Sequence, residues 1–198
     1  MHKLIPFILH FEAGLPASKL SLPWPRIFEE ARKSGFSNDP HDAGGATLCG
    51  VTIATLSHYR HLRGLPAPTV AELKALPADT WRDILKSLFW DRWQADRIAS
   101  PEVARILVDW VWASGVHGIR IPQRMLGVKT DGVVGPATLA ALNRRIATEG
   151  EVFANILTEE RLRFIDRIIA RRPSQAHYRA GWRRRIQSIR GLPITRTK

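Results

Sequence analysis

Cysteine is nearly absent from this sequence of 198 residues: Cys49 is the only one, so no disulfide can form within the chain. Long apolar runs are missing too, since no segment approaches the roughly 18 apolar residues that a transmembrane helix needs. The apolar stretch at 4–11 is too short for a signal peptide and ends at Glu12. We therefore expect a protein that is made in the cytoplasm and acts outside only after something else releases it.

The sequence also lacks the motifs of several enzyme classes. It contains no P-loop, no Gly-x-Gly-x-x-Gly segment and no nucleophile elbow. Its seven histidines are scattered without the spacing of metal ligands. His58 and His61 are three residues apart, but Arg60 and Arg63 beside them favour a solvated helix face. We expect neither a metal nor an organic cofactor.

Positive charge is abundant and unevenly distributed. Residues 144–198 carry fourteen Lys and Arg against five Asp and Glu, which supplies +9 of the net charge of +12. Such a basic region favours an anionic polymer as partner, whether nucleic acid, a membrane surface or the bacterial wall, although a solvated face without a partner is an equal alternative. No motif for sequence-specific binding of nucleic acid accompanies this basic region, so we expect no specific nucleic acid as partner. We also expect a monomeric protein.

Helical signals dominate the chain, and strand-like alternation is scarce, so the sequence predicts a mainly α fold. Thr52 and Ser100 are expected N-caps, Thr69 and Glu72 have the spacing of a capping box, and the glycine-rich segment 36–52 is compatible with a small hairpin. Helices are expected at about 3–12, 26–33, 53–62, 78–89, 101–112, 136–142, 151–171 and 176–189.

One acid and one loop carry the most specific chemistry. Glycoside hydrolysis needs a carboxylic acid that protonates the leaving oxygen, together with a nucleophile or a positioned water on the other face of the sugar. Glu12 ends an apolar helix, where apolar surroundings and the helix C-terminus favour the protonated form of a carboxyl. An exposed helix-end glutamate is the alternative. The polar candidates for positioning substrate or water in the loop are Asp39, Asp42, Gly44, Gly45 and Thr47.

Each loop residue also has a plain structural explanation, because Asn-Asp-Pro and Asp before Gly-Gly are common in turns. Trp90 and Trp93 are candidates for lining a glycan cleft, with core packing as the alternative for at least one of them. Asp109 lies inside an apolar helix, so we expect it to be buried and to pair with an arginine or cap a helix. Glu29 and Glu30 are rival acids on an amphipathic helix.

Two segments resemble glycoside hydrolase family 108, whose members are described as secretion-activating proteins and N-acetylmuramidases. They are Glu12-Ala-Gly and the stretch Asn38-Asp-Pro-His-Asp-Ala-Gly-Gly-Ala-Thr-Leu-Cys-Gly-Val-Thr52, with further similarity at 90–93 and 109–115. The resemblance implies a lysozyme-like fold and maps the family's catalytic acid onto Glu12. The sequence departs from the family at Ala13, which is usually Gly, and by an insertion at about 15–35. That insertion is expected to form a lid or an outer flap.

The second half resembles the peptidoglycan-binding region that accompanies this family. The resemblance rests on residues 126–142, in which Asp131-Gly-Val-Val-Gly-Pro-Ala-Thr138 is the most specific part. We therefore expect a catalytic region at 1–98 and a peptidoglycan-binding-like region at 99–198, packed as one compact body.

The resemblance implies a hydrolase that cleaves peptidoglycan between N-acetylmuramic acid and N-acetylglucosamine at the bacterial cell wall, with Glu12 as the acid. Peptidoglycan strands, and other anionic wall polymers, are the expected partners. Two alternatives stay open. One is a lytic transglycosylase, and the other is a wall-binding or secretion-associated protein without catalytic activity.

Overall fold

A computed structural model describes residues 1–39 and 45–190 of the chain and confirms the mainly α fold. The chain forms two compact units, Met1–Leu88 and Phe89–Lys198. None of the helices in the described ranges is both long enough and apolar enough to cross a lipid bilayer.

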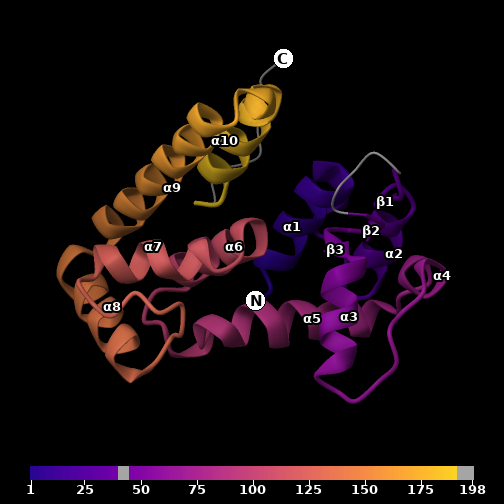
Figure 1. Ribbon diagram of the computed structural model, residues 1–198, viewed down its shortest axis with the longest axis horizontal. Coiled ribbons are helices and arrows are strands. Elements are labelled where there is room, and N and C mark those ends of the chain that lie inside the picture. Colours follow the sequence, from indigo (N-terminus) through magenta and orange to yellow (C-terminus); the bar gives the residue numbers. More distant parts are fainter. Residues whose placement is uncertain (40–44, 191–198) are drawn as a thin grey trace. The chain divides into compact units, whose positions relative to one another are not determined.

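The first unit combines helices with one small sheet (Figure 1). Its helices are α1 (Leu4–Ala13), the short 3-10 helix η1 (Ala17–Lys19), α2 (Arg26–Arg32), α3 (Ile53–His61), α4 (Val70–Lys74) and α5 (Ala78–Leu85). Thr52 accepts a hydrogen bond from the backbone of Thr55 at the start of α3, and Thr69 and Glu72 form the expected capping box at α4.

Helix α1 is the centre of this unit, since Leu4, Ile8 and Leu9 are all fully buried. A helix that is apolar on nearly all sides is stable only when other elements surround it. Gly14 ends the helix in the left-handed conformation, with φ of 66°, and its N–H donates to the carbonyl of Leu9. The expected helix and its glycine stop are therefore both present, and Glu12 lies in the last turn.

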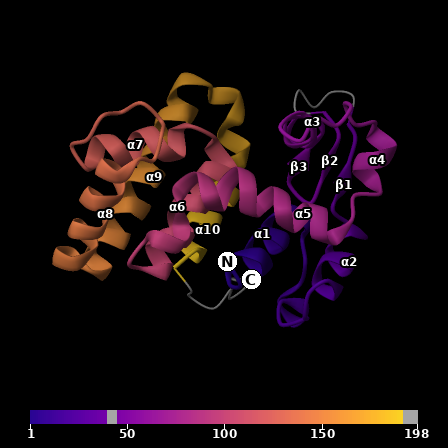
Figure 2. The same ribbon diagram turned by 90° about the horizontal axis from the view of Figure 1, so that it is seen from below.

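The sheet has three two-residue strands, β1 (Phe36–Ser37), β2 (Thr47–Leu48) and β3 (Val51–Thr52), paired antiparallel in chain order. Strands β2 and β3 form a hairpin, in agreement with the small hairpin considered for segment 36–52. Its turn is Cys49-Gly50, with φ of 47° and 82°. Positive φ at both turn residues matches the right-handed twist of the paired strands. Figure 2 shows the three strands beside α3 and α4.

The segment at 15–35 contributes to the core of the first unit. Leu15 and Ile27 are each 2% exposed, Phe28 and Ala31 are fully buried, and α2 packs against α1. Phe28 also contacts Trp81 of α5, with ring centroids 5.6 Å apart. The expectation of a lid or flap is therefore wrong for the part that forms α2, because removing this helix would expose the centre of the unit.

Helices are the regular secondary structure of the described residues of the second unit. After the π-helical junction Lys86–Trp90 come η3 (Asp91–Trp93), η4 (Ala95–Arg97), α6 (Pro101–Ser114), α7 (His117–Met125), α8 (Pro136–Glu149), α9 (Glu151–Arg171), η5 (Pro173–Tyr178) and α10 (Arg179–Ser188). Helix α6 packs against α7 and α9, and α9 packs against α8 and α10 (Figure 1).

The expectation that Asp109 is buried and paired with arginine is confirmed. Asp109 is 0% exposed; its Oδ2 lies 2.7 Å from Nη1 of Arg161 on α9, and its Oδ1 lies 2.7 Å from Nη2 of Arg185 on α10. Burial by itself raises the pKa of Asp109, but the two guanidinium groups outweigh that effect and lower the pKa. One carboxylate thus ties together three helices and leaves this buried cluster with one net positive charge.

Candidate active site

Glu12 is half-buried in the last turn of α1, and the neighbouring backbone is tied to the segment that leads into the sheet. The hydroxyl of Ser34 donates to the carbonyl of Ala13 at 2.9 Å. That bond satisfies a carbonyl that the helix end leaves without an internal partner. The turn that carries Glu12 is therefore fixed against the entry to β1.

Gly35 and Cys49 complete this attachment. The Cys49 N–H donates to the carbonyl of Gly35 at 2.7 Å. A Cβ on Gly35 would lie 2.5 Å from Cys49 Sγ and 3.0 Å from Ala13 Cβ, so only glycine fits here without a shift. The end of α1, the residues after α2 and the hairpin turn consequently meet at one closely packed point.

Charged groups around this point affect the pKa of the Cys49 thiol. Burial raises the pKa of the thiol to about 12; Arg32 opposes the rise, and the carboxylates of Glu12 and Glu29 add to it. Two of the three candidate acids thus act electrostatically on the same buried thiol. Cys49 itself is fully buried and is a packing residue.

A row of hydroxyl groups crosses the sheet. The pairing places Ser37 opposite Thr47 and Thr47 opposite Thr52, and residues paired in this way share one face. The other row consists of Phe36, Leu48 and Val51, of which the last two are buried. The sheet therefore has an apolar face toward the core and a face with three hydroxyl groups. Sequence reasoning identified Thr47 but missed Ser37 and Thr52.

The remaining loop candidates lie close to this face in the chain. Asp39 is exposed two residues after Ser37, and Gly45 has φ of 67°. The Thr47 hydroxyl donates to the carbonyl of Gly45 at 3.3 Å, which holds the end of the loop against β2. Asp42 and Gly44, the other two loop candidates, lie outside the described residues.

The rival acids on α2 have strong partners. Glu30 lies 2.6 Å from Lys19 Nζ and 2.6 Å from Lys33 Nζ, and these two hydrogen-bonded lysines lower the pKa of its carboxyl to about 2. A group with that pKa is ionised at neutral pH and has no proton to donate. Glu29 is exposed and lies 3.4 Å from Arg32.

Trp90 and Trp93 belong to the core, which corrects the expectation that they line a glycan cleft. Trp90 is 5% exposed and its indole N–H donates to Asp96 at 2.8 Å. Trp93 is fully buried and donates to the carbonyl of Gly118 at 3.2 Å. A sugar stacks on an exposed ring face, and neither ring offers one. The aromatic-rich sequence at 90–93 could not reveal this, because burial depends on the packing of α6 and α7.

No metal site is apparent in the part of the chain that the structure describes. Within residues 1–39 and 45–190, no three His, Cys, Asp or Glu side chains are grouped so that they could hold a metal ion.

Comparison with known proteins shows the family to which this chain belongs. Residues 29–115 match the family described as Glycosyl hydrolase 108, and residues 117–187 match the region described as Predicted Peptidoglycan domain. The solved structure of SagA from Brucella abortus is similar to this chain, with 30% sequence identity, a TM-score of 0.67, and coverage of 84% of this chain and 88% of that chain. This protein belongs to glycosyl hydrolase family 108. A comparison with the curated proteins found no match.

As a member of family 108, the chain is a glycoside hydrolase with a peptidoglycan-binding region at its C-terminal side. The match to the hydrolase family includes Glu29 and Glu30, the sheet and all of α6, whereas Glu12 precedes it. The match to the peptidoglycan-binding region covers α7, α8, α9 and most of α10.

Proposed function

We propose that this family-108 protein is an N-acetylmuramidase, which hydrolyses the bond between N-acetylmuramic acid and N-acetylglucosamine in peptidoglycan with Glu12 as general acid. The proposal rests mainly on the position of Glu12. It is half-buried in the last turn of a buried helix, and that turn is packed through Gly35 and Cys49 onto the glycine-rich hairpin.

The electrostatics of the rival acids support the choice. A general acid must carry a proton at working pH and reach the glycosidic oxygen. Lys19 and Lys33 hold Glu30 ionised, with a pKa of about 2, and Glu29 is exposed beside Arg32. Glu12 is half-buried, whereas Glu29 is exposed, so we assign the proton donor to Glu12 although the family match begins after it.

The second half of the reaction needs water at the anomeric carbon. Hydroxyl and carboxylate oxygens can hold such a water or stabilise the positive charge that develops on the sugar in the transition state. In our proposal Thr47 and the loop acids Asp39 and Asp42 have this role. We expect that Gly44 and Gly45, which have no side chains, allow a close approach of the sugar to the loop backbone.

Product analysis tests the reaction itself. Purified sacculi would be digested in water enriched in oxygen-18, and the released fragments reduced with borohydride and analysed by mass spectrometry. A muramidase gives fragments that end in reduced N-acetylmuramic acid and carry one heavy oxygen. Fragments with a 1,6-anhydro end and no heavy oxygen would instead identify a transglycosylase, and reduced N-acetylglucosamine ends would show that the other bond is cut. Absence of any fragment from several wall types would favour a binding protein without activity.

A further inference from the structure

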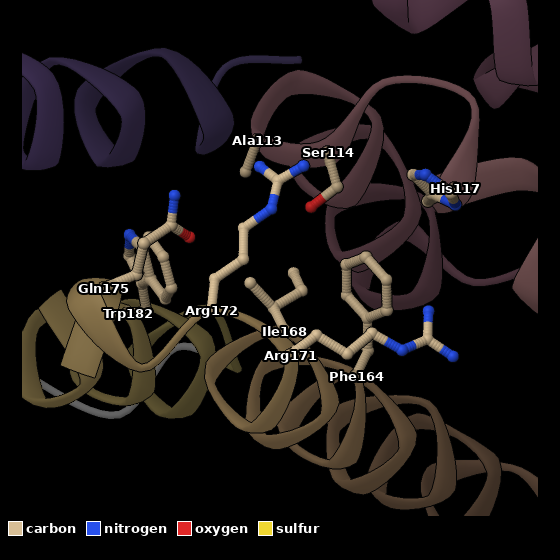
Figure 3. Close-up of a pocket in the computed structure, with 9 residues that line it drawn as sticks. All are labelled: Ala113, Ser114, His117, Phe164, Ile168, Arg171, Arg172, Gln175 and Trp182. Carbon is tan, nitrogen blue, oxygen red and sulfur yellow. The ribbon is translucent and has the colours of Figure 1, made fainter.

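The second unit contains a cavity that the catalytic proposal does not use. It has a volume of about 430 Å³ and lies where the end of α6 and the start of α7 face α9, η5 and α10 (Figure 3). Its walls include Ser114, His117, Phe164, Arg171, Arg172 and Trp182. A volume of this size suits a small ligand or a short peptide.

A smaller cavity of about 110 Å³ adjoins it and shares Ser114, Ile168 and Trp182 with it. Arg161 and Arg185 line this smaller cavity. Both guanidinium groups pair with the carboxylate of Asp109, so two positive charges and one negative charge lie beside the cavity. No acidic side chain of the described residues lines either cavity.

Two further arginines line the larger cavity and have no acidic partner among the described residues. Arg171 and Arg172 are exposed, and neither forms an ion pair with any residue in the described ranges. The neighbouring Arg179 and Arg183 differ, since both pair with Asp166. Figure 3 shows the Arg172 side chain extending toward Ser114 across the cavity. An unpaired guanidinium can bind a carboxylate through two parallel hydrogen bonds.

Apolar and aromatic side chains line another part of the wall, next to the polar Ser114 and Gln175. The Phe164 ring lies 5.4 Å from the His117 ring, and the Trp182 ring stacks with Tyr178 at 5.5 Å. Ile168 on α9 lies between Phe164 and Trp182 (Figure 3) and lines both cavities. The site therefore combines positive charge with a surface that accepts methyl groups.

We propose that this cavity binds the stem peptide of peptidoglycan, and that the free carboxylates of the peptide pair with the arginines of the cavity. The stem peptide carries alanine methyl groups together with several carboxylates, whereas most of the glycan chain is uncharged. Four arginines beside an apolar wall fit the peptide better than the sugars. The identity of the ligand rests on the proposed function, because it assumes that peptidoglycan is the substrate.

Binding of soluble fragments by the full chain tests this assignment. The probes are a disaccharide-tetrapeptide muropeptide, the free tetrapeptide, and the disaccharide without peptide, with affinity measured by calorimetry. The muropeptide monomer contains no bond that a muramidase cuts, so binding is measured without turnover. We expect the first two probes to bind and the third to bind at least about tenfold more weakly, as expected when a charge-assisted hydrogen bond is lost.

The decisive variant is Arg171→Gln/Arg172→Gln, which should weaken muropeptide binding at least about tenfold. The matched control is Arg163→Gln/Arg167→Gln, which removes the same charge from exposed positions on α9 that do not line the cavity. It should bind as the wild type does, and circular dichroism checks that both variants fold.

Equal weakening by both double variants would overturn the proposal, because only general charge would then matter. Equal affinity for the disaccharide with and without its peptide would overturn it as well, and so would undetectable binding of the muropeptide. The free tetrapeptide contains no sugar, so its binding is measured independently of Glu12. A failure of the muramidase assignment is therefore separate from a failure of this one.

Discussion

The Cys49 sulfur occupies the space that a side chain on Gly35 would need. A Cβ on Gly35 would lie 2.5 Å from Sγ, and the backbones of the two residues are joined by a hydrogen bond of 2.7 Å. This contact fixes the hairpin turn to the residues that follow α2. Ala13, next to Glu12, lies at the same point, so the position of the proposed acid depends on the contact.

Replacing Gly35 should therefore disturb the first unit. We expect Gly35→Ala to lower the free energy of unfolding by about 1–3 kcal/mol, the usual effect of overpacking a core. Urea denaturation measures this change. Gly181→Ala is the control: Gly181 lies inside α10 with open space around it, so added helix propensity should stabilise the protein by about 0.5–1 kcal/mol.

A double variant separates the sulfur contact from other effects. Cys49→Gly removes the sulfur and suits the positive φ of 47° at this position. The variant carrying both Gly35→Ala and Cys49→Gly should be less destabilised than the sum of the single variants by about 1 kcal/mol. Strictly additive losses would show that the sulfur contact is not what excludes a larger residue at position 35.

Removing the charge of Asp109 should destabilise the second unit strongly. Asp109→Asn keeps the shape of the side chain but removes the buried carboxylate charge that pairs with Arg161 and Arg185. Breaking a buried ion pair in this way costs about 3–5 kcal/mol. The measurement is the urea midpoint near neutral pH. A loss well under 1 kcal/mol would show that water or another group compensates the two arginines.

Acid should weaken the fold through Glu30. Its carboxyl has an ordinary pKa of 4.5 and a folded-state pKa of about 2, so the folded state binds fewer protons than the unfolded state between these values. The stabilising effect is present above about pH 4.5 and is lost as the pH falls toward 2. Urea midpoints across this range should fall less steeply for Glu30→Gln than for the wild type. Parallel curves would contradict the paired state of Glu30.

Because Trp93 is buried, replacing it should reduce the stability of the fold without reducing glycan binding. Trp93→Phe leaves the carbonyl of Gly118 without its indole partner and should lower the free energy of unfolding by about 1–3 kcal/mol. Trp24→Phe is a milder control, because its indole N–H donates to Asp79 in an exposed position. If the folded Trp93→Phe protein binds sacculi much more weakly than the wild type, Trp93 has a role in the site after all.

Local signals in the sequence predicted much of the fold. The helix expected at 151–171 has those bounds in the structure, and the cap at Thr52 and the capping box at Thr69 are both formed. Helix α7 was missed because Gly115 and Gly118 appeared to mark only the end of α6. Tertiary packing requires glycine at position 118, because a Cβ there would lie 2.5 Å from the backbone N of Val111.

The candidate site was less predictable, for physical reasons. Two-residue strands are too short to show alternation, so Ser37 and Thr52 could not be placed on the same face as Thr47. The residues that line the larger cavity come from two segments, 113–117 and 164–182, and only the packing of α6, α9 and α10 brings these segments together. The ion pairs that disqualify Glu30 likewise depend on Lys19, whose distance from it is a result of folding.

Clearing of purified peptidoglycan by single-acid variants tests the central claim most directly. The comparison is between the wild type, Glu12→Gln, Glu29→Gln and Glu30→Gln at matched concentrations of folded protein. We predict that Glu12→Gln lowers the initial rate at least about a hundredfold, as expected for loss of a general acid, and that the other two variants stay within a few-fold of the wild type. Clearing by Glu12→Gln at the wild-type rate, or loss of clearing in Glu29→Gln alone, would contradict the assignment of Glu12.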